Sequence, residues 1–235
     1  MTAAEIIKEI RPLGSDAYKK IMFNHGAQEP VFGVKIEELK KIQKRIKKDY
    51  QLALDLYDTG VYDAMYLAGL IADDAKMTVK DLQRWAERAT CHAISECTVA
   101  WVAAESPHGL EMALKWIDSK KETIAAGGWA TLSSLVSITE DGALDIPLLK
   151  RLLGRVRETI HSSPNRVRYT MNGFVIAAGS YVKELTPLCL ETAKKIGPVT
   201  VDMGDTECKV RDAASYIDKV KKRGSLGKKR KTAKC

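Results

Sequence analysis

No proline occurs between Pro30 and Pro107, and this long interval constrains the fold more than any other feature of the sequence. Within it, apolar residues recur every three or four positions, and Gly, Asp or Thr interrupt the pattern at short intervals. Apolar residues at that spacing form one face of an α-helix, whereas a half-buried strand alternates with period two. The interval therefore predicts a succession of short α-helices.

The same spacing continues to the end of the chain, and no segment shows a sustained period of two. A Thr-x-x-Asp pattern at Thr78–Asp81 is typical of a helix start, as is Ser106 followed by Pro107. We therefore predict an all-α protein. The predicted helices span residues 35–49, 50–58, 61–71, 78–86, 93–104, 108–117, 121–136, 143–160, 165–178, 186–196 and 212–222.

About a dozen short helices joined by brief connectors cannot all surround one centre. Antiparallel helix pairs stacked into a curved solenoid bury their apolar faces efficiently, at roughly 35–45 residues per repeat. No sharp sequence period supports this arrangement, so an irregular helical bundle is the alternative. We predict one helical domain over residues 1–222, followed by a basic tail over 223–235 without fixed structure.

The net charge of +8 is not spread over the chain. From Asp218 to the C-terminus there are nine Lys and Arg residues against one acid, which accounts for the whole excess, and the preceding residues sum to zero. Net charge alone therefore does not indicate a nucleic-acid partner, and only local clusters of basic residues can do so.

Five cysteines are scattered along the chain without a Cys-x-x-Cys pair, which favours a reducing compartment over a disulfide framework. There is no apolar leader at the N-terminus and no apolar run long enough to cross a membrane, so we expect a cytoplasmic protein without a membrane partner. Cys91 and Cys97 are six residues apart and would diverge by about 240° on a helix, so we expect no metal site with His92.

Four segments together resemble the AlkD-like DNA alkylation repair family, whose members are HEAT-like helical-repeat proteins. They occur in the family's order, and the resemblance extends from about Ser15 to Lys222, nearly the whole chain. The segments are FGVKIEELKK at 32–41, LALDLYDTG at 52–60, the stretch Trp85–Trp101, and RYTMNGF at 168–174. The resemblance implies a curved solenoid with a basic concave face that binds the phosphate backbone of double-stranded DNA.

Family members of known activity are DNA glycosylases that excise cationic N3- or N7-alkylated purines and need no cofactor. The family's signature, an aromatic residue and a carboxylate four residues apart, matches His92 and Glu96 here, so the resemblance implies Glu96 as the group that stabilises the sugar cation. Phe174 matches a second aromatic position, and Trp129 is the further candidate for contact with a damaged base. The family's inner-face arginine falls near Trp129, where this chain has none.

Six basic residues within a short interval are the candidates for phosphate contacts, since Arg in particular forms forked hydrogen bonds with phosphate. Each has an alternative interpretation as a solvated helix end, just as His92 and Glu96 could be a helix-surface pair and the tryptophans could be core residues. The six are Lys150, Arg151, Arg155, Arg157, Arg166 and Arg168.

Three functions are compatible with these residues. The first is a DNA-binding repair protein, with or without glycosylase activity. The second is a non-catalytic binder of bent, branched or damaged DNA, which the altered signature favours. The third is a protein-interaction solenoid, because a helical-repeat fold does not determine its partner.

Overall fold

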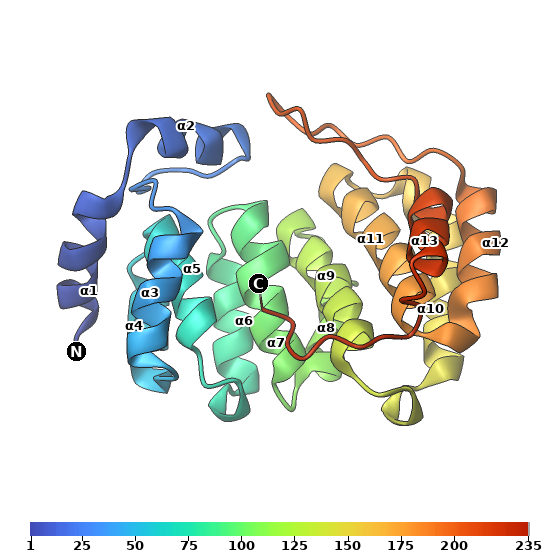
Figure 1. Ribbon diagram of the computed structural model, residues 1–235, viewed down its shortest axis with the longest axis horizontal. Helices are drawn as coiled ribbons and strands as arrows, with labels where there is room; N and C mark the ends of the chain where they lie inside the picture. The colour runs from blue at the N-terminus through green and yellow to red at the C-terminus, as the bar shows by residue number, and fades with distance from the viewer. Residues whose placement is uncertain (235) are drawn as a thin grey trace.

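The computed structural model describes residues 1–234, and these fold as an all-α protein (Figure 1). A single bridge pairs Gly14 with Val34, and the described residues form no β-strand. None of the described helices is long and apolar enough to cross a membrane. The α-helices are α1 Ala3–Ile10, α2 Asp16–Asn24, α3 Ile36–Ile46, α4 Tyr50–Asp58, α5 Tyr62–Ile71, α6 Val79–Arg88, α7 Ala100–Glu105, α8 Gly109–Trp116, α9 Glu122–Ile138, α10 Ile146–Thr159, α11 Asn165–Tyr181, α12 Thr186–Ile196 and α13 Ala213–Lys222.

The prediction of an all-α chain is confirmed, and only α1 and α2 lie outside the predicted helices. Both begin at residues that cap helices well. Thr2 accepts a hydrogen bond from the backbone N–H of Glu5, whose carboxylate accepts one from the N–H of Thr2 in return. Ser15 caps α2 through the N–H of Tyr18. Directly before α7 the chain forms a π-helical turn, η3, at Ile94–Val99.

The helices stack in two rows, as predicted for a solenoid of antiparallel pairs. The inner row consists of α3, α5, η3 with α7, α9, α11 and α13, each packed against the next. The outer row consists of α4, α6, α8, α10 and α12, where α4 pairs with α5 and α8 with α9. Successive inner helices run in the same direction, so their N-terminal ends lie along one edge of the row and their C-terminal ends along the other.

The core between the rows divides into two clusters of buried side chains, one in each half of the chain. In the first, the ring of Tyr57 stacks on that of Trp85 with centroids 4.1 Å apart. In the second, Trp129 of α9 packs on Phe174 of α11 at 5.4 Å. Gly127 brings α9 close to η3, because a Cβ at that position would lie 2.7 Å from the Ser95 hydroxyl.

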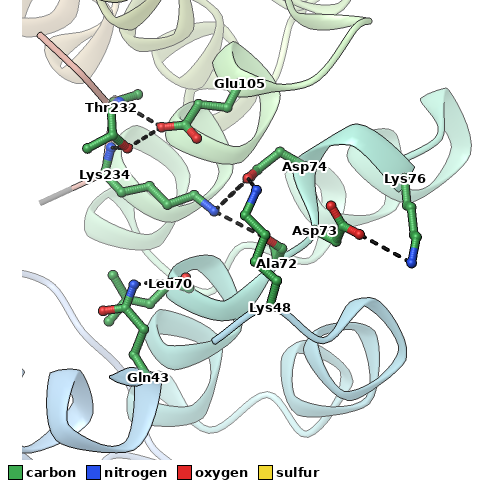
Figure 2. Close-up of polar contacts among 11 residues, drawn as sticks. Gln43, Lys48, Leu70, Ala72, Asp73, Asp74, Lys76, Glu105, Thr232 and Lys234 are labelled. Carbon is green, nitrogen blue, oxygen red and sulfur yellow. Dashed lines mark hydrogen bonds and ion pairs between the residues drawn. The ribbon is translucent and has the colours of Figure 1, made fainter. Parts of the chain in front are cut away.

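The sequence analysis predicted a C-terminal tail without fixed structure, but the described part of the tail is held against the helices. Residues 224–234 leave α13 and run across the C-terminal ends of α11, α9 and α7 toward the end of α5 (Figure 1). The N–H of Gly227 bonds the carbonyl of Ser180, and the N–H of Arg230 bonds that of Ser137. Near its end, Thr232 and Ala233 both donate to the Glu105 carboxylate (Figure 2).

The basic side chains of the tail explain why it is ordered. The C-terminal end of a helix carries unpaired carbonyls and a partial negative charge, which cations neutralise. Lys229 Nζ donates to the carbonyl of Val136 at 3.0 Å, and Lys234 Nζ donates to that of Ala72 at 3.3 Å. Lys234 also lies 2.8 and 2.9 Å from the two carboxylate oxygens of Asp74 (Figure 2). The sequence pattern of the tail shows its charge but not these acceptors.

Candidate nucleic-acid interface

A cavity of about 430 Å³ opens at the N-terminal ends of the inner helices and contains both His92 and Glu96. We call it the Glu96 cavity. Its walls come from α2, α3, α5, η3 and the start of α11, with Met203 and Cys208 from the connection between α12 and α13. His92 and Glu96, four residues apart in sequence, therefore lie in the same cavity. The π-helical turn that holds Glu96 is a local widening of the helix of the kind found often at functional sites.

The Glu96 carboxylate forms a buried ion pair with an arginine. Arg166, at the start of α11, donates from Nε to Oε1 at 2.8 Å and from Nη2 to Oε2 at 2.6 Å. The pair is enclosed, since the side chains of Glu96 and Arg166 are 9% and 15% exposed. The guanidinium also lies 4.3 Å from the centre of the Tyr169 ring. Both carboxylate oxygens thus have a cationic partner supplied by another helix.

The position of Arg166 is fixed from a second direction. Its backbone N–H donates to the Glu122 carboxylate at 2.6 Å, which ties the start of α11 to the start of α9. A carboxylate that accepts from a helix N-terminus stabilises that end of the helix. Arg166 therefore lies next to Glu96 because it is part of α11, and the position of α11 is determined by its packing against α9.

Burial shifts the pKa values of two residues in the Glu96 cavity, His92 and Glu96. Desolvation, together with the nearby charges of Arg166 and His25, lowers the pKa of His92 to about 4. The imidazole is therefore neutral at physiological pH and offers one donor and one acceptor rather than a charge. Burial raises the pKa of the Glu96 carboxyl, and the hydrogen bonds from Arg166 oppose that rise.

Two segments reach over the Glu96 cavity. The C-terminal end of α2 lies against residues 204–208, and the two share a smaller hollow with His25 and Cys208 among its walls. Figure 1 shows α2 and the connection before α13 projecting beyond the same end of the inner row. Gly26 comes so close to His92 that a Cβ there would lie 3.0 Å from the imidazole. The cavity is therefore approached between these two segments.

The two aromatic residues predicted to contact a damaged base do not line this cavity. Trp129 and Phe174 are each 0% exposed and pack on one another in the second core cluster. Their positions follow from helix packing, because Gly127 and Gly128 draw α9 against its neighbours and turn the Trp129 ring inward. The structure places both residues in the core, which is their alternative interpretation, and their contact with a damaged base stays a prediction.

The six predicted phosphate contacts are not on one surface either. Lys150, Arg151, Arg155 and Arg157 lie on α10 in the outer row, and none of them lines the Glu96 cavity. Lys150 is paired with Glu184 at 2.8 Å, and Arg155 with Asp118 at 2.6 Å.

The two predicted contacts on α11 also differ from each other. Arg166 is held by Glu96, and Arg168 bonds weakly to Asn165 at 3.4 Å. The six candidates are divided between the two rows because the α10–α11 connection reverses the chain, and their contact with phosphate stays a prediction. Sequence reasoning also missed Tyr169, which follows Arg166 by one turn and packs on its guanidinium.

Within residues 1–234, no three His, Cys, Asp or Glu side chains are grouped so as to hold a metal ion. The chemistry of the Glu96 cavity is that of a neutral imidazole, a paired carboxylate and several tyrosine rings. The tyrosines are Tyr18, Tyr62, Tyr66 and Tyr169.

Two rows of paired helices, with a buried acid–arginine pair between inner helices, define a helical-repeat protein. Residues 6–216 match the family model described as DNA alkylation repair enzyme. The chain therefore belongs to the DNA alkylation repair enzyme family, as its sequence motifs indicated.

Relatives of full length support this assignment. A Listeria innocua protein, described as uncharacterized, is 34% identical over 229 residues, covering 95% of this chain and 99% of that protein. An uncharacterized Listeria monocytogenes protein is 33% identical with the same coverage. A solved structure, 36% identical with a TM-score of 0.93, covers 100% of both chains. It is described as a new family of proteins related to the HEAT-like repeat DNA glycosylases, with affinity for branched DNA structures. The fold is accordingly a HEAT-like helical-repeat solenoid.

Proposed function

We propose that this protein is a cytoplasmic binder of distorted double-stranded DNA, meaning bent, branched or damaged duplex, and that it leaves the glycosidic bond intact. Membership of the DNA alkylation repair enzyme family supports a DNA partner. The affinity for branched DNA described for the 36% identical structure supports a distorted duplex as the preferred form.

The pairing of Glu96 with Arg166 is the observation that carries this proposal. Excision of an alkylated purine requires a carboxylate whose negative charge faces the developing sugar cation. Here the guanidinium takes both oxygens, so the pair has no net charge to offer. The backbone of Arg166 is also anchored through Glu122, and withdrawing its side chain would leave the enclosed Glu96 carboxylate without a partner.

Binding to distorted DNA would depend on phosphate contacts, which are independent of sequence and sensitive to salt. Arg151 and Arg157 are exposed on α10 and have no carboxylate partner among the described residues, so they stay candidates at the outer row. The more concentrated group of basic residues lies near α13 and the tail, along the inner row.

Gel retention of a four-way junction and of a linear duplex of equal length, measured over a salt series, tests the binding. We expect the junction to be retained at least about tenfold more tightly at 50 mM salt, with both affinities falling as salt rises. Equal affinity for the two DNAs would contradict a preference for distorted duplex. No retention of either DNA at low salt would favour the protein-interaction solenoid instead.

A glycosylase is the second candidate, and one observation favours it. His92 and Glu96 share a cavity whose volume of about 430 Å³ is within the range of small-molecule sites. For this activity, Arg166 would have to release Glu96 when DNA binds. Release of methylated bases decides between the two candidates.

A further inference from the structure

A second cavity, of about 510 Å³, lies on the inner row where α11, α13 and the start of the tail meet. We call it the C-terminal cavity. It shares Tyr169 with the Glu96 cavity, so the two hollows are neighbours along the same row. None of the residues predicted from the sequence as site residues lines it. Its volume is typical of a site for a small molecule or for one unit of a polymer.

All the charged residues that line the C-terminal cavity are basic. Five basic residues line it and no acidic residue does. Lys229 is neutralised by Asp141 at 2.8 Å, and Arg230 bonds to the carbonyl of Lys234. The remaining three, Arg211, Arg223 and Lys228, have no carboxylate partner among the described residues and are exposed at its rim. Concentrated, unpaired cations around a concavity attract an anion.

A buried hydroxyl without a partner lies in the same cavity. Ser180 is 4% exposed, and its Oγ makes no hydrogen bond. Most buried hydroxyls in proteins are satisfied by a nearby carbonyl, as Thr186 Oγ1 is by the carbonyl of Gly179. The Ser180 hydroxyl is thus an unsatisfied polar group in the wall of the cavity, enclosed by the protein rather than open to a ligand.

The walls also present aromatic faces. Tyr169, Tyr181 and Tyr216 line the cavity, and the Arg211 guanidinium lies 4.9 Å from the centre of the Tyr216 ring. A planar base stacks on a tyrosine ring or on a guanidinium, and such stacking contributes about 1–3 kcal/mol per base. Phosphate, in turn, pairs with Arg and Lys. One chemical unit, the nucleotide, combines these two requirements.

We propose that the C-terminal cavity binds an unpaired nucleotide of a DNA strand, with its base against the tyrosines and its phosphate against Arg223 and Lys228. This inference rests on the proposed function. It identifies one feature of distorted DNA that the protein recognises, since a flap, a gap or a damaged site exposes unpaired nucleotides, whereas intact duplex and a fully paired four-way junction do not. A strand that passes the Glu96 cavity reaches the C-terminal cavity at Tyr169.

Gly173 allows a test that does not endanger the fold. It lies inside α11 and lines the cavity, and a Cβ there would meet nothing within 4 Å. Gly154, inside α10 of the outer row, is equally unobstructed and lines none of these cavities. Because leucine is the better helix former, Gly173→Leu and Gly154→Leu should each raise the Tm by about 2–3 °C. Only Gly173→Leu fills the cavity.

The measurement is the affinity of each variant for a duplex that carries an unpaired five-nucleotide flap and for the same duplex with blunt ends. We expect wild type and Gly154→Leu to prefer the flap, and Gly173→Leu to bind the flap about tenfold more weakly while its affinity for blunt duplex is unchanged. Equal flap affinity for the two leucine variants would overturn the proposal.

Charge reversal gives a second measurement. Arg223→Glu with Lys228→Glu should abolish the preference for the flap, whereas Lys221→Glu with Lys222→Glu makes the same change of charge on α13 outside the cavity and should retain it. Deoxynucleoside monophosphate added at millimolar concentration distinguishes the two sources of a nucleotide. Competition with the flap would show that a free nucleotide also fits, and its absence that the strand is required.

The outcomes separate this inference from the proposed function. If wild type prefers a four-way junction to linear duplex but does not distinguish flap from blunt ends, the proposed function stands and the nucleotide site is wrong. If wild type binds none of these DNAs, the proposed function itself fails.

Discussion

The inner row of helices carries a buried ion pair at each of its edges, and the two pairs differ in what holds them. At the N-terminal edge, Glu96 of η3 meets Arg166 of α11, and both residues belong to packed helices. At the C-terminal edge, Asp74 meets Lys234, which lies at the end of the described chain (Figure 2). Asp74 also has Lys48 as a second cation at 3.3 Å.

The difference shows that basic side chains are held in different ways in this protein. Arg166 makes two hydrogen bonds to the enclosed Glu96 carboxylate, so its charge is neutralised within the protein. Lys234 is placed by a tail that joins the structure through a few contacts at helix ends. The basic residues of the C-terminal cavity form a third group, because Arg211, Arg223 and Lys228 have no acidic partner among the described residues.

Removing Glu96 should have the largest effect on stability. Glu96→Ala leaves Arg166 enclosed without its carboxylate, and loss of one partner of a buried pair costs about 3–5 kcal/mol. We expect the midpoint of urea unfolding to fall accordingly. The double variant Glu96→Met with Arg166→Met replaces both charges by apolar groups and should recover most of the loss. A Glu96→Ala midpoint within error of wild type would contradict the rigid placement of Arg166.

Removing Lys234 should have a smaller effect. Lys234→Ala leaves Asp74 with Lys48 as its remaining cation, so we expect a loss of about 1.5 kcal/mol, as for one hydrogen bond to a charged group. Lys231→Ala, an exposed tail residue without an ion pair among the described residues, is the control and should match wild type in the same urea experiment. A loss equal to that of Glu96→Ala would show that the two edges are held alike.

Most of the fold could be predicted from the sequence because helix formation is local. Apolar spacing located eleven of the helices within a few residues. The start of α1 was readable as well, from the capping box at Thr2 and Glu5 and from the helical apolar spacing of Ile6, Ile7 and Ile10. The order of the tail could not be predicted in this way, since its partners are carbonyls at the ends of α5 and α9, far away in sequence.

The candidate site was predictable in part. His92 and Glu96 were found because they match the family's signature of an aromatic residue and a carboxylate four residues apart, and the structure places both in one cavity. The burial of Phe174 was readable as well, because Met171 and Ala178 continue its apolar stripe along α11. Arg166 is 70 residues from Glu96, and only the packing of α11 against α9 brings the two together.

Base release from methylated DNA tests the central claim most directly, namely that this family member binds DNA without excising bases. Wild type would be incubated in excess with DNA containing N3-methyladenine and N7-methylguanine, and released bases and retained DNA would be measured in the same reaction. We predict retained DNA with no base released above the protein-free control. Release by wild type that is lost in Glu96→Gln would contradict the account and show that Arg166 frees the carboxylate when DNA binds.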